Sequence, residues 1–240
     1  MTPRFLLSGD TAVTVEFGDR IDRAVSEAVL HLDALGRAAE VPGVVETVPT
    51  FRSLTVHYDP LSTGPDVLVP RIGELVEGAR DATPPAKLWR VPASYASVHA
   101  PDLADVVRRT TLSTEEVVDL HTGIQFHVYM LGFAPGYPYM GDLPESLVLP
   151  RRADPRTRVP AGSVAIAASM TAIYPVESPG GWHLIGATPI RLFDPHSPHP
   201  ALFDPGDAVC FEPISVREFE AIRTAVAAGT YRVPCESLTR

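Results

Sequence analysis

The chain contains little cysteine and almost no lysine. Its two cysteines, Cys210 and Cys235, are too few for a disulfide framework and lack metal-ligand spacing. His196 and His199 have no third ligand beside them, so no metal is expected. Arginine supplies all but one of the 20 basic residues, and the net charge is −9. An acidic chain with scattered arginines lacks the basic face that nucleic-acid binding requires, which argues against nucleic acid as a partner.

Long apolar runs and a leader segment are also missing. No run approaches the roughly 20 apolar residues that a membrane span needs, and residues 1–10 are too polar for a signal peptide. We therefore expect a cytoplasmic protein without a membrane partner. Phosphate-binding loops, dinucleotide fingerprints and serine-centred nucleophile motifs are absent from the sequence. With 45% hydrophobic residues in 240, the chain predicts one large globular domain or two small ones.

Hydrophobic periodicity separates residues 1–85 from residues 86–240. In the first part, alternation predicts strands and three- and four-residue steps predict helices, in the order β-α-β-β-α. The second helix could begin at Pro70, because proline suits a first helical turn. Residues 81–86 contain Pro84 and Pro85 and predict a linker. The predicted strands are 13–17, 44–48 and 54–58, and the predicted helices are 21–39 and 68–79.

The second part is rich in turn residues. Thirteen of the 25 prolines lie in residues 134–205, which excludes long helices there and favours a β-barrel or sandwich. Ser113 and Glu116 form a capping-box pattern, and Gly229 follows the last apolar stripe as a helix stop. The predicted helices are 101–110, 113–122 and 216–228, and the predicted strands are 163–168, 182–185, 190–193 and 207–211.

Polar residues alternate along the segment 125–131. As a strand, this segment places Gln125, His127 and Tyr129 on one face and Phe126, Val128 and Met130 on the other. The polar face suits a binding surface at a barrel mouth, and it equally suits a hydrogen-bonded strand face. The loop that follows carries Phe133 and Tyr137 among glycines and prolines. These rings would either bind something or pack across the barrel end.

Arginines and glycines mark two further segments. Arg151, Arg152, Arg156 and Arg158 fall within eight residues, and guanidinium groups suit carboxylate or phosphate recognition, although loop arginines are often solvated. Gly180 and Gly181 precede Trp182, where backbone amides without side chains could hold an anion or form a tight hairpin.

These motifs, taken together, resemble a known family. Residues 129–139 (YMLGFAPGYPY), 159–164 (VPAGSV) and 178–182 (SPGGW) are similar to the KipI/PxpB family, which is also labelled allophanate hydrolase subunit 1 or the B-type subunit of 5-oxoprolinase. Residues 49–56 (PTFRSLTV) and 184–186 (LIG) match as well. The resemblance therefore spans nearly the whole chain.

The resemblance implies an α+β fold, with an α/β sandwich domain in residues 1–85 and a cyclophilin-like β-barrel domain in residues 86–240. It implies one subunit of an ATP-dependent 5-oxoprolinase, which converts 5-oxoproline, ATP and water to glutamate, ADP and phosphate. A sister KipA/PxpC-type subunit and a separate ring-opening subunit are the implied partners. ATP with Mg²⁺ is expected at the level of the complex, and no cofactor is expected on this chain alone.

Residue roles follow from that enzyme hypothesis, in which the chain is not active alone. His127, Arg156 and Arg158 are the candidate catalytic residues. The candidate substrate-binding residues are Gln125, Tyr129, Phe133, Tyr137, Arg151, Gly180, Gly181 and Trp182. The alternatives are a KipI-like regulatory module that inhibits a histidine kinase, or an accessory domain of a urea carboxylase or allophanate-type amide pathway.

The chain departs from the family pattern at two polar positions. Met170 stands where the family usually has glutamine, and Ala187 stands where it tends to have arginine. A thioether cannot replace an amide as donor and acceptor, and alanine removes a guanidinium. The departures indicate either a shifted substrate or a decayed catalytic part.

Overall fold

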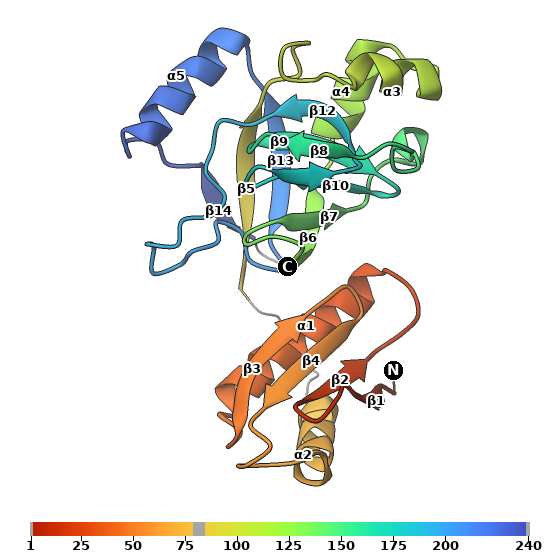
Figure 1. Cartoon of the computed structure of the whole chain (residues 1–240), viewed down its shortest axis with the longest axis vertical. Coiled ribbons are helices and arrows are strands. Elements are labelled where there is room, and N and C mark those ends of the chain that lie inside the picture. The colour runs from red at the N-terminus through yellow and green to blue at the C-terminus, as the bar shows by residue number, and fades with distance from the viewer. Residues whose placement is uncertain (1, 79–84, 239–240) are drawn as a thin grey trace. The chain divides into compact units, whose positions relative to one another are not determined.

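The computed structural model describes residues 2–78 and 85–238 (Figure 1). These residues divide into two compact units on either side of the boundary between Pro85 and Ala86. Most of the predicted linker, up to residue 84, lies outside the described residues. No helix within the described ranges is both long enough and apolar enough to span a membrane.

The first unit is a four-stranded antiparallel sheet packed against two helices. The strand order is β1-β2-β4-β3. Residues that alternate along β2 and β4, such as Val13, Val15 and Val56, form a core with Val29 and Leu68 of the helices. The elements are β1 (Arg4–Leu7), β2 (Ala12–Glu16), α1 (Arg23–Ala38), β3 (Val44–Pro49), β4 (Ser53–Tyr58) and α2 (Pro65–Gly78).

Two features of this unit differ from the sequence prediction. Strand β1 was not predicted, because it is a largely exposed edge strand without alternation. Helix α2 begins at Pro65, so a start at Pro70 is wrong. Pro70 lies early in the helix, where its missing N–H removes one backbone hydrogen bond near the amino-terminal end.

The second unit is built on an eight-stranded sheet. Its order is β12-β9-β10-β7-β6-β13-β5-β14. Ser94, just after β5, bridges Ala187 at the end of β12 through N–H···O bonds of 2.8 and 2.9 Å. The strands are β5 (Ala86–Ala93), β6 (Phe126–Leu131), β7 (Pro138–Gly141), β9 (Ser163–Ala167), β10 (Met170–Ile173), β12 (His183–Ala187), β13 (Ala208–Pro213) and β14 (Cys235–Leu238). The curved sheet is therefore linked by one bridge between β12 and the residue after β5, while β14 lies beyond β5 at the other edge. The described strands form no closed barrel, and the α+β class is confirmed.

Helices and a small sheet surround this curved sheet. Helix α3 (Leu103–Thr110) contacts β12, α4 (Thr114–Thr122) contacts β13, and α5 (Val216–Ala227) lies on the opposite side in the view of Figure 1. The short strands β8 (Arg156–Val159) and β11 (Ser178–Gly180) pair only with each other in the described chain. A 3-10 turn spans Glu145–Leu147.

The helix predictions for this unit are confirmed, including the Ser113/Glu116 capping box and the left-handed Gly229 (φ 71°) beyond α5. The predicted strand at 190–193 is wrong. The segment is irregular, with single contacts such as the Leu202 N–H donating to the Leu192 carbonyl and the Phe193–Ala201 bridge. Prolines at 195, 198 and 200 prevent a continuous ladder there.

A chain of polar side chains crosses the core of the second unit. The Tyr95 hydroxyl lies 2.8 Å from His121 Nδ1, and His121 Nε2 lies 2.9 Å from the Thr171 hydroxyl. Because Thr171 donates to the Ala165 carbonyl, it accepts from His121, which fixes the Nε2–H tautomer. Burial lowers the pKa of His121 from 6.5 to about 3, so the ring is neutral near neutral pH.

This buried histidine predicts a loss of stability in mild acid. The unfolded chain takes up a proton near pH 6.5, whereas the folded chain does not until about pH 3. Unfolding is therefore favoured as the pH falls below 6.5, with a slope approaching about 1.4 kcal/mol per pH unit from this group. Urea denaturation between pH 7 and pH 4.5 should show a shallower dependence for His121→Gln than for the parent. Equal slopes would rule out a neutral buried His121.

Candidate functional site

Four aromatic rings gather on the face of the curved sheet near β7, and we call them the aromatic cluster. Tyr137 contacts Tyr174 and Trp182 edge-to-face, with ring centroids 5.1 and 6.3 Å apart. Tyr139 lies 6.0 Å from Trp182. Tyr137, Tyr174 and Trp182 are buried and Tyr139 is half-buried. The sequence motifs at 129–139 and 178–182 therefore meet in space, and Tyr137 and Trp182 lie together as part of one surface.

Glycine allows these rings to approach the backbone. A Cβ on Gly180 would lie 2.2 Å from the Tyr174 hydroxyl, so only glycine fits there without a shift of the ring. Gly180 itself pairs with Arg156 between β11 and β8. The Gly181 carbonyl accepts a 2.8 Å hydrogen bond from the Arg152 N–H. The glycine pair thus serves packing and strand pairing, but β11 pairs with β8 and not with β12, so the glycines do not form a hairpin. The binding role of Gly180 and Gly181 stays a prediction.

Arg151 extends from the loop onto the aromatic cluster. Its guanidinium carbon lies 5.9 Å from the centre of the Trp182 ring, within cation–π range. Burial raises the pKa of Tyr139 and Tyr174, and the positive charge of Arg151 opposes that shift at both hydroxyls. Within residues 2–78 and 85–238, Arg151 pairs with no carboxylate. It is an exposed cation beside an aromatic surface, which suits an anion.

Hydrogen bonds on both sides fix the backbone of Arg151. Before it, the Pro150 carbonyl lies 2.9 Å from His183 Nε2. After it, the Arg152 N–H donates to Gly181. The guanidinium is therefore presented from a segment that is held on β12 and on the turn before it.

A buried carboxylate, Asp102, holds two of the other arginines. Its oxygens accept from Arg152 Nη1 at 2.9 Å and from both Nη atoms of Arg156 at 2.8 and 2.7 Å. The Leu184 N–H donates to the same carboxylate at 2.7 Å. Asp102 is 3% exposed. Sequence reasoning missed this residue because its position before α3 is that of an ordinary N-cap, yet its side chain makes no cap hydrogen bond.

Arg158, a predicted catalytic residue, has a different environment. Its Nε and Nη2 donate to Glu177 at 3.0 and 2.9 Å. The Arg158 side chain is 76% exposed, so this is a solvated surface pair. The four neighbouring arginines therefore separate into two that hold Asp102, one paired at the surface and one that lies on the aromatic cluster. The catalytic roles of Arg156 and Arg158 stay predictions.

His127 and Tyr129 lie on one face of β6, and their rings meet at 4.6 Å. Both are buried, and the Tyr129 hydroxyl donates to Asp142 at 3.2 Å. Gln125 is exposed and precedes the strand. The predicted alternation stops at a bulge between Val128 and Met130, where Met130 pairs with Tyr139. The roles of His127, Tyr129 and Gln125 in binding or catalysis stay predictions.

Phe133 stands out on the loop between β6 and β7. Its ring is 63% exposed and contacts Tyr137 at 5.3 Å. Its φ of 68° lies in the left-handed region, which bulky residues rarely adopt. A strained and exposed aromatic residue beside the aromatic cluster suits a binding role, which stays a prediction.

A metal centre has no counterpart in the described ranges, where no three His, Cys, Asp or Glu side chains are arranged to hold an ion. The site is therefore one of aromatic rings, a guanidinium without a carboxylate partner in those ranges, and a tightly held loop. Such a surface suits an anionic group attached to a flat or apolar body.

Comparison with known proteins identifies the class. Residues 3–203 match the family described as "Carboxyltransferase domain, subdomain C and D". The K. lactis urea amidolyase structure superposes with a TM-score of 0.80 at 20% identity, over 98% of this chain and 16% of that one, which shows the shared fold.

The particular family is also shown. The B-type subunit of 5-oxoprolinase from Bacillus subtilis (strain 168) is 39% identical over 236 residues, which cover 93% of this chain and 98% of that relative. The solved structure of TTHA0988 is 34% identical with a TM-score of 0.77, and the match covers 86% of this chain and 40% of that chain. The chain belongs to the family of B-type 5-oxoprolinase subunits.

The Asp102 network predicts that replacing one carboxylate oxygen of Asp102 by an amide nitrogen lowers the stability of the protein considerably. Asp102→Asn removes the charge that two guanidinium groups share, which leaves part-buried cations without a partner. We expect the free energy of unfolding to fall by about 2–4 kcal/mol. Asp105→Asn is the matched control, because Asp105 pairs with Arg108 and Arg109 at the surface, and it should cost less than about 1 kcal/mol. Equal effects in urea denaturation would contradict the buried network.

The left-handed backbone of Phe133 predicts that a glycine variant is more stable than an alanine variant at this position, which is the reverse of the usual order. At ordinary positions alanine is more stabilising than glycine, but alanine retains the left-handed strain. We expect Phe133→Gly to be more stable than Phe133→Ala by about 1 kcal/mol. Thermal unfolding of the two variants measures this difference directly. A more stable alanine variant would show that φ at this position is not positive.

Proposed function

We propose that this chain is the B-type subunit of an ATP-dependent 5-oxoprolinase, which converts 5-oxoproline, ATP and water to glutamate, ADP and phosphate. The observation that carries the proposal is the 39% identity to the Bacillus subtilis B-type subunit over nearly the full length of both chains. The site supports it, because 5-oxoproline is a small carboxylate on a flat lactam ring. Arg151 offers a cation for the carboxylate, and the half-buried Tyr139 and the exposed Phe133 offer aromatic surface for the ring.

The chemistry requires activation of an unreactive amide. Transfer of the γ-phosphoryl group of ATP to the lactam oxygen releases ADP and makes the ring carbon a better electrophile. Water then adds to that carbon and the ring C–N bond breaks, which leaves an acyl phosphate of glutamate. A second water hydrolyses this acyl phosphate to glutamate and phosphate. Guanidinium groups stabilise charge that develops on a phosphoryl group or an oxyanion.

This chain contributes binding and orientation in the proposal. It carries no phosphate-binding loop, and its described residues form no metal site. We therefore assign ATP with Mg²⁺ to the assembled complex, with a sister KipA/PxpC-type subunit and a separate ring-opening subunit.

Arg156 acts through Asp102 in this proposal. Both terminal guanidinium nitrogens of Arg156 are committed to that carboxylate, which also holds Arg152 next to Arg151. Arg156 is thus a positioning residue for the anion-binding loop. His127 and Tyr129 lie on the β6 face as further candidates.

A second candidate function is a regulatory module that docks on another protein, such as a histidine kinase. The exposed and strained Phe133 favours it, because a partner would cover a ring that is costly to leave in water. This function predicts tight binding without ATP hydrolysis or glutamate release.

Arg151 gives the decisive test of the enzyme function. The chain would be coexpressed with its two partner subunits, and 5-oxoproline-dependent ADP and glutamate release would be measured. We expect Arg151→Gln to lower kcat/KM for 5-oxoproline by about 10- to 100-fold, because a charged hydrogen bond is lost. Arg223→Gln is the matched control, since Arg223 pairs with Glu220 at the surface of α5, and it should stay within about twofold of the parent.

Two outcomes would change the assignment. If Arg158→Gln lowers kcat/KM by the amount expected for Arg151→Gln, and Arg151→Gln itself has no effect, the anion-binding role belongs to Arg158. A stable three-subunit complex that releases no glutamate would contradict the 5-oxoprolinase proposal and favour the regulatory module.

A further inference from the structure

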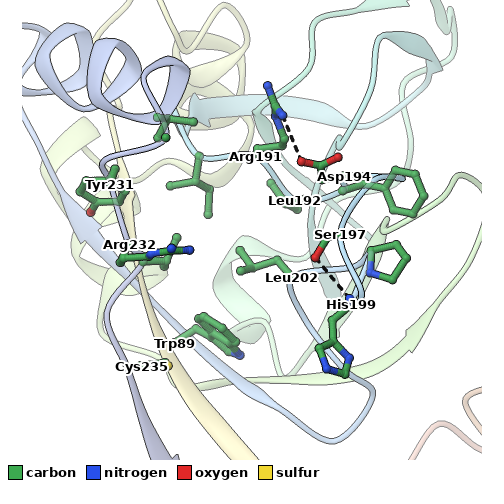
Figure 2. Close-up of a pocket in the computed structure, with 16 residues that line it drawn as sticks. Trp89, Arg191, Leu192, Asp194, Ser197, His199, Leu202, Tyr231, Arg232 and Cys235 are labelled. Atoms are coloured by element: carbon green, nitrogen blue, oxygen red, sulfur yellow. Dashed lines mark hydrogen bonds and ion pairs between the residues drawn. The ribbon is translucent and has the colours of Figure 1, made fainter.

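A pocket of about 520 Å³ lies in the second unit, at a place that the proposed function does not use (Figure 2). It is bounded by Trp89 of β5, by the irregular segment 190–202 and by the chain that follows α5. Its volume is within the range of about 300–1,000 Å³ that small-molecule sites occupy. None of its lining residues belongs to the aromatic cluster or the Asp102 network.

Backbone hydrogen bonds hold the walls of this pocket in place. On one side, the Asp194 N–H donates to the Pro200 carbonyl at 2.8 Å, and Leu202 donates to Leu192 at 2.8 Å. On the other side, the Arg90 N–H donates to the Pro234 carbonyl at 3.0 Å, and β14 pairs with β5. The pocket is therefore formed before any ligand arrives, which lowers the entropic cost of binding.

The floor and walls are aromatic and apolar. Trp89 is buried, and its indole N–H donates to Asp207 at 2.7 Å, so the polar atom of the ring is already satisfied. Leu192, Leu202 and Tyr231 add to the apolar lining, beside polar residues such as Ser197 and His199. The lining therefore offers a ligand both apolar surface and polar groups.

The charges in the pocket are unbalanced. Arg191 is paired with Asp194 at 3.3 Å. Arg232 has no carboxylate partner in the described parts of the chain, and Figure 2 shows its guanidinium directed into the hollow between Tyr231 and Trp89. The Lys87 ammonium, 5.4 Å from the centre of the Trp89 ring, adds a second positive charge near the floor. A positively charged pocket with aromatic and apolar lining attracts an anion that carries an apolar body.

We propose that this pocket binds a small organic anion, with its acidic group on Arg232 and its ring or hydrocarbon body against Trp89. The ligand class is a carboxylate, sulfonate or phosphate monoester attached to a planar apolar group. The inference is independent of the 5-oxoprolinase proposal, because it involves neither Arg151 nor the aromatic cluster.

The two tryptophans of the chain make the test specific. Trp182 lies in the aromatic cluster and Trp89 in the pocket, and the sequence has no other. In a Trp182→Phe background, tryptophan fluorescence reports on Trp89 alone. The probe is anilinonaphthalene sulfonate, which accepts energy from a nearby tryptophan. Phenylnaphthylamine, which has the same rings without the sulfonate, is the uncharged control.

We expect energy transfer from Trp89 to the bound sulfonate probe, and a dissociation constant about tenfold lower for that probe than for phenylnaphthylamine. Arg232→Gln should remove this preference and leave phenylnaphthylamine binding unchanged. Arg223→Gln should retain the preference, and circular dichroism and thermal unfolding confirm that each variant is folded.

Two results would overturn the proposal. The first is a sulfonate preference that survives in Arg232→Gln, which would place the probe elsewhere. The second is energy transfer that disappears in the Trp182→Phe background, which would assign the probe to the aromatic cluster. Neither result bears on glutamate release by the complex, so the two proposals fail separately.

Discussion

The carboxylate of Asp102 connects three segments that lie far apart in the sequence. It stands at the start of α3, binds the guanidinium groups of Arg152 and Arg156, and accepts the N–H of Leu184 on β12. Removing such a group from water is costly, and the hydrogen bonds around it offset that cost rather than exceed it. The network therefore contributes mainly to geometry: it fixes the loop that carries Arg151 against the turn before β12.

The aromatic cluster depends on that loop and on the glycines around it. Tyr174 can lie on Gly180 because no side chain is present, and Tyr129 packs in the same way on Gly141. Phe133 is held with a left-handed backbone in a turn where the Tyr137 N–H donates to the Ala134 carbonyl at 3.0 Å. Rigid packing below and a strained ring at the surface together define a preformed face rather than one that must fold around its ligand.

The sequence predicts the helices of this fold well because each has a polar side that marks the period. The start of helix α4 is also marked in the sequence by the capping box of Ser113 and Glu116. Strand β9 was predicted from the apolar run 163–168, whereas β10 was not predicted. Both are buried on both faces, so no alternation separates their two sides. Strands β8 and β11 contain three or four residues, too few for any period to be visible.

The site was less predictable than the fold. The role of each arginine depends on which carboxylate it pairs with, and the residue type alone does not show that. Four arginines within eight residues have the same appearance in the sequence. Their roles separate only when Asp102, about fifty residues earlier, accepts two of them and Glu177 accepts a third. No local pattern encodes that separation, because the carboxylate and the guanidinium groups belong to different elements.

Arginines that have no carboxylate partner in the described residues are therefore candidates for anion binding. The chain carries a net charge of −9, so acidic groups are available to pair with its basic residues. Arg4, Arg37, Arg71 and Arg90 all lie against acidic side chains. Arg151 instead lies over the Trp182 ring, and Arg232 lines a pocket that contains Trp89 and Tyr231. In an acidic protein, an arginine that has no carboxylate partner keeps its positive charge available, so an anionic ligand can supply the partner that the chain itself does not.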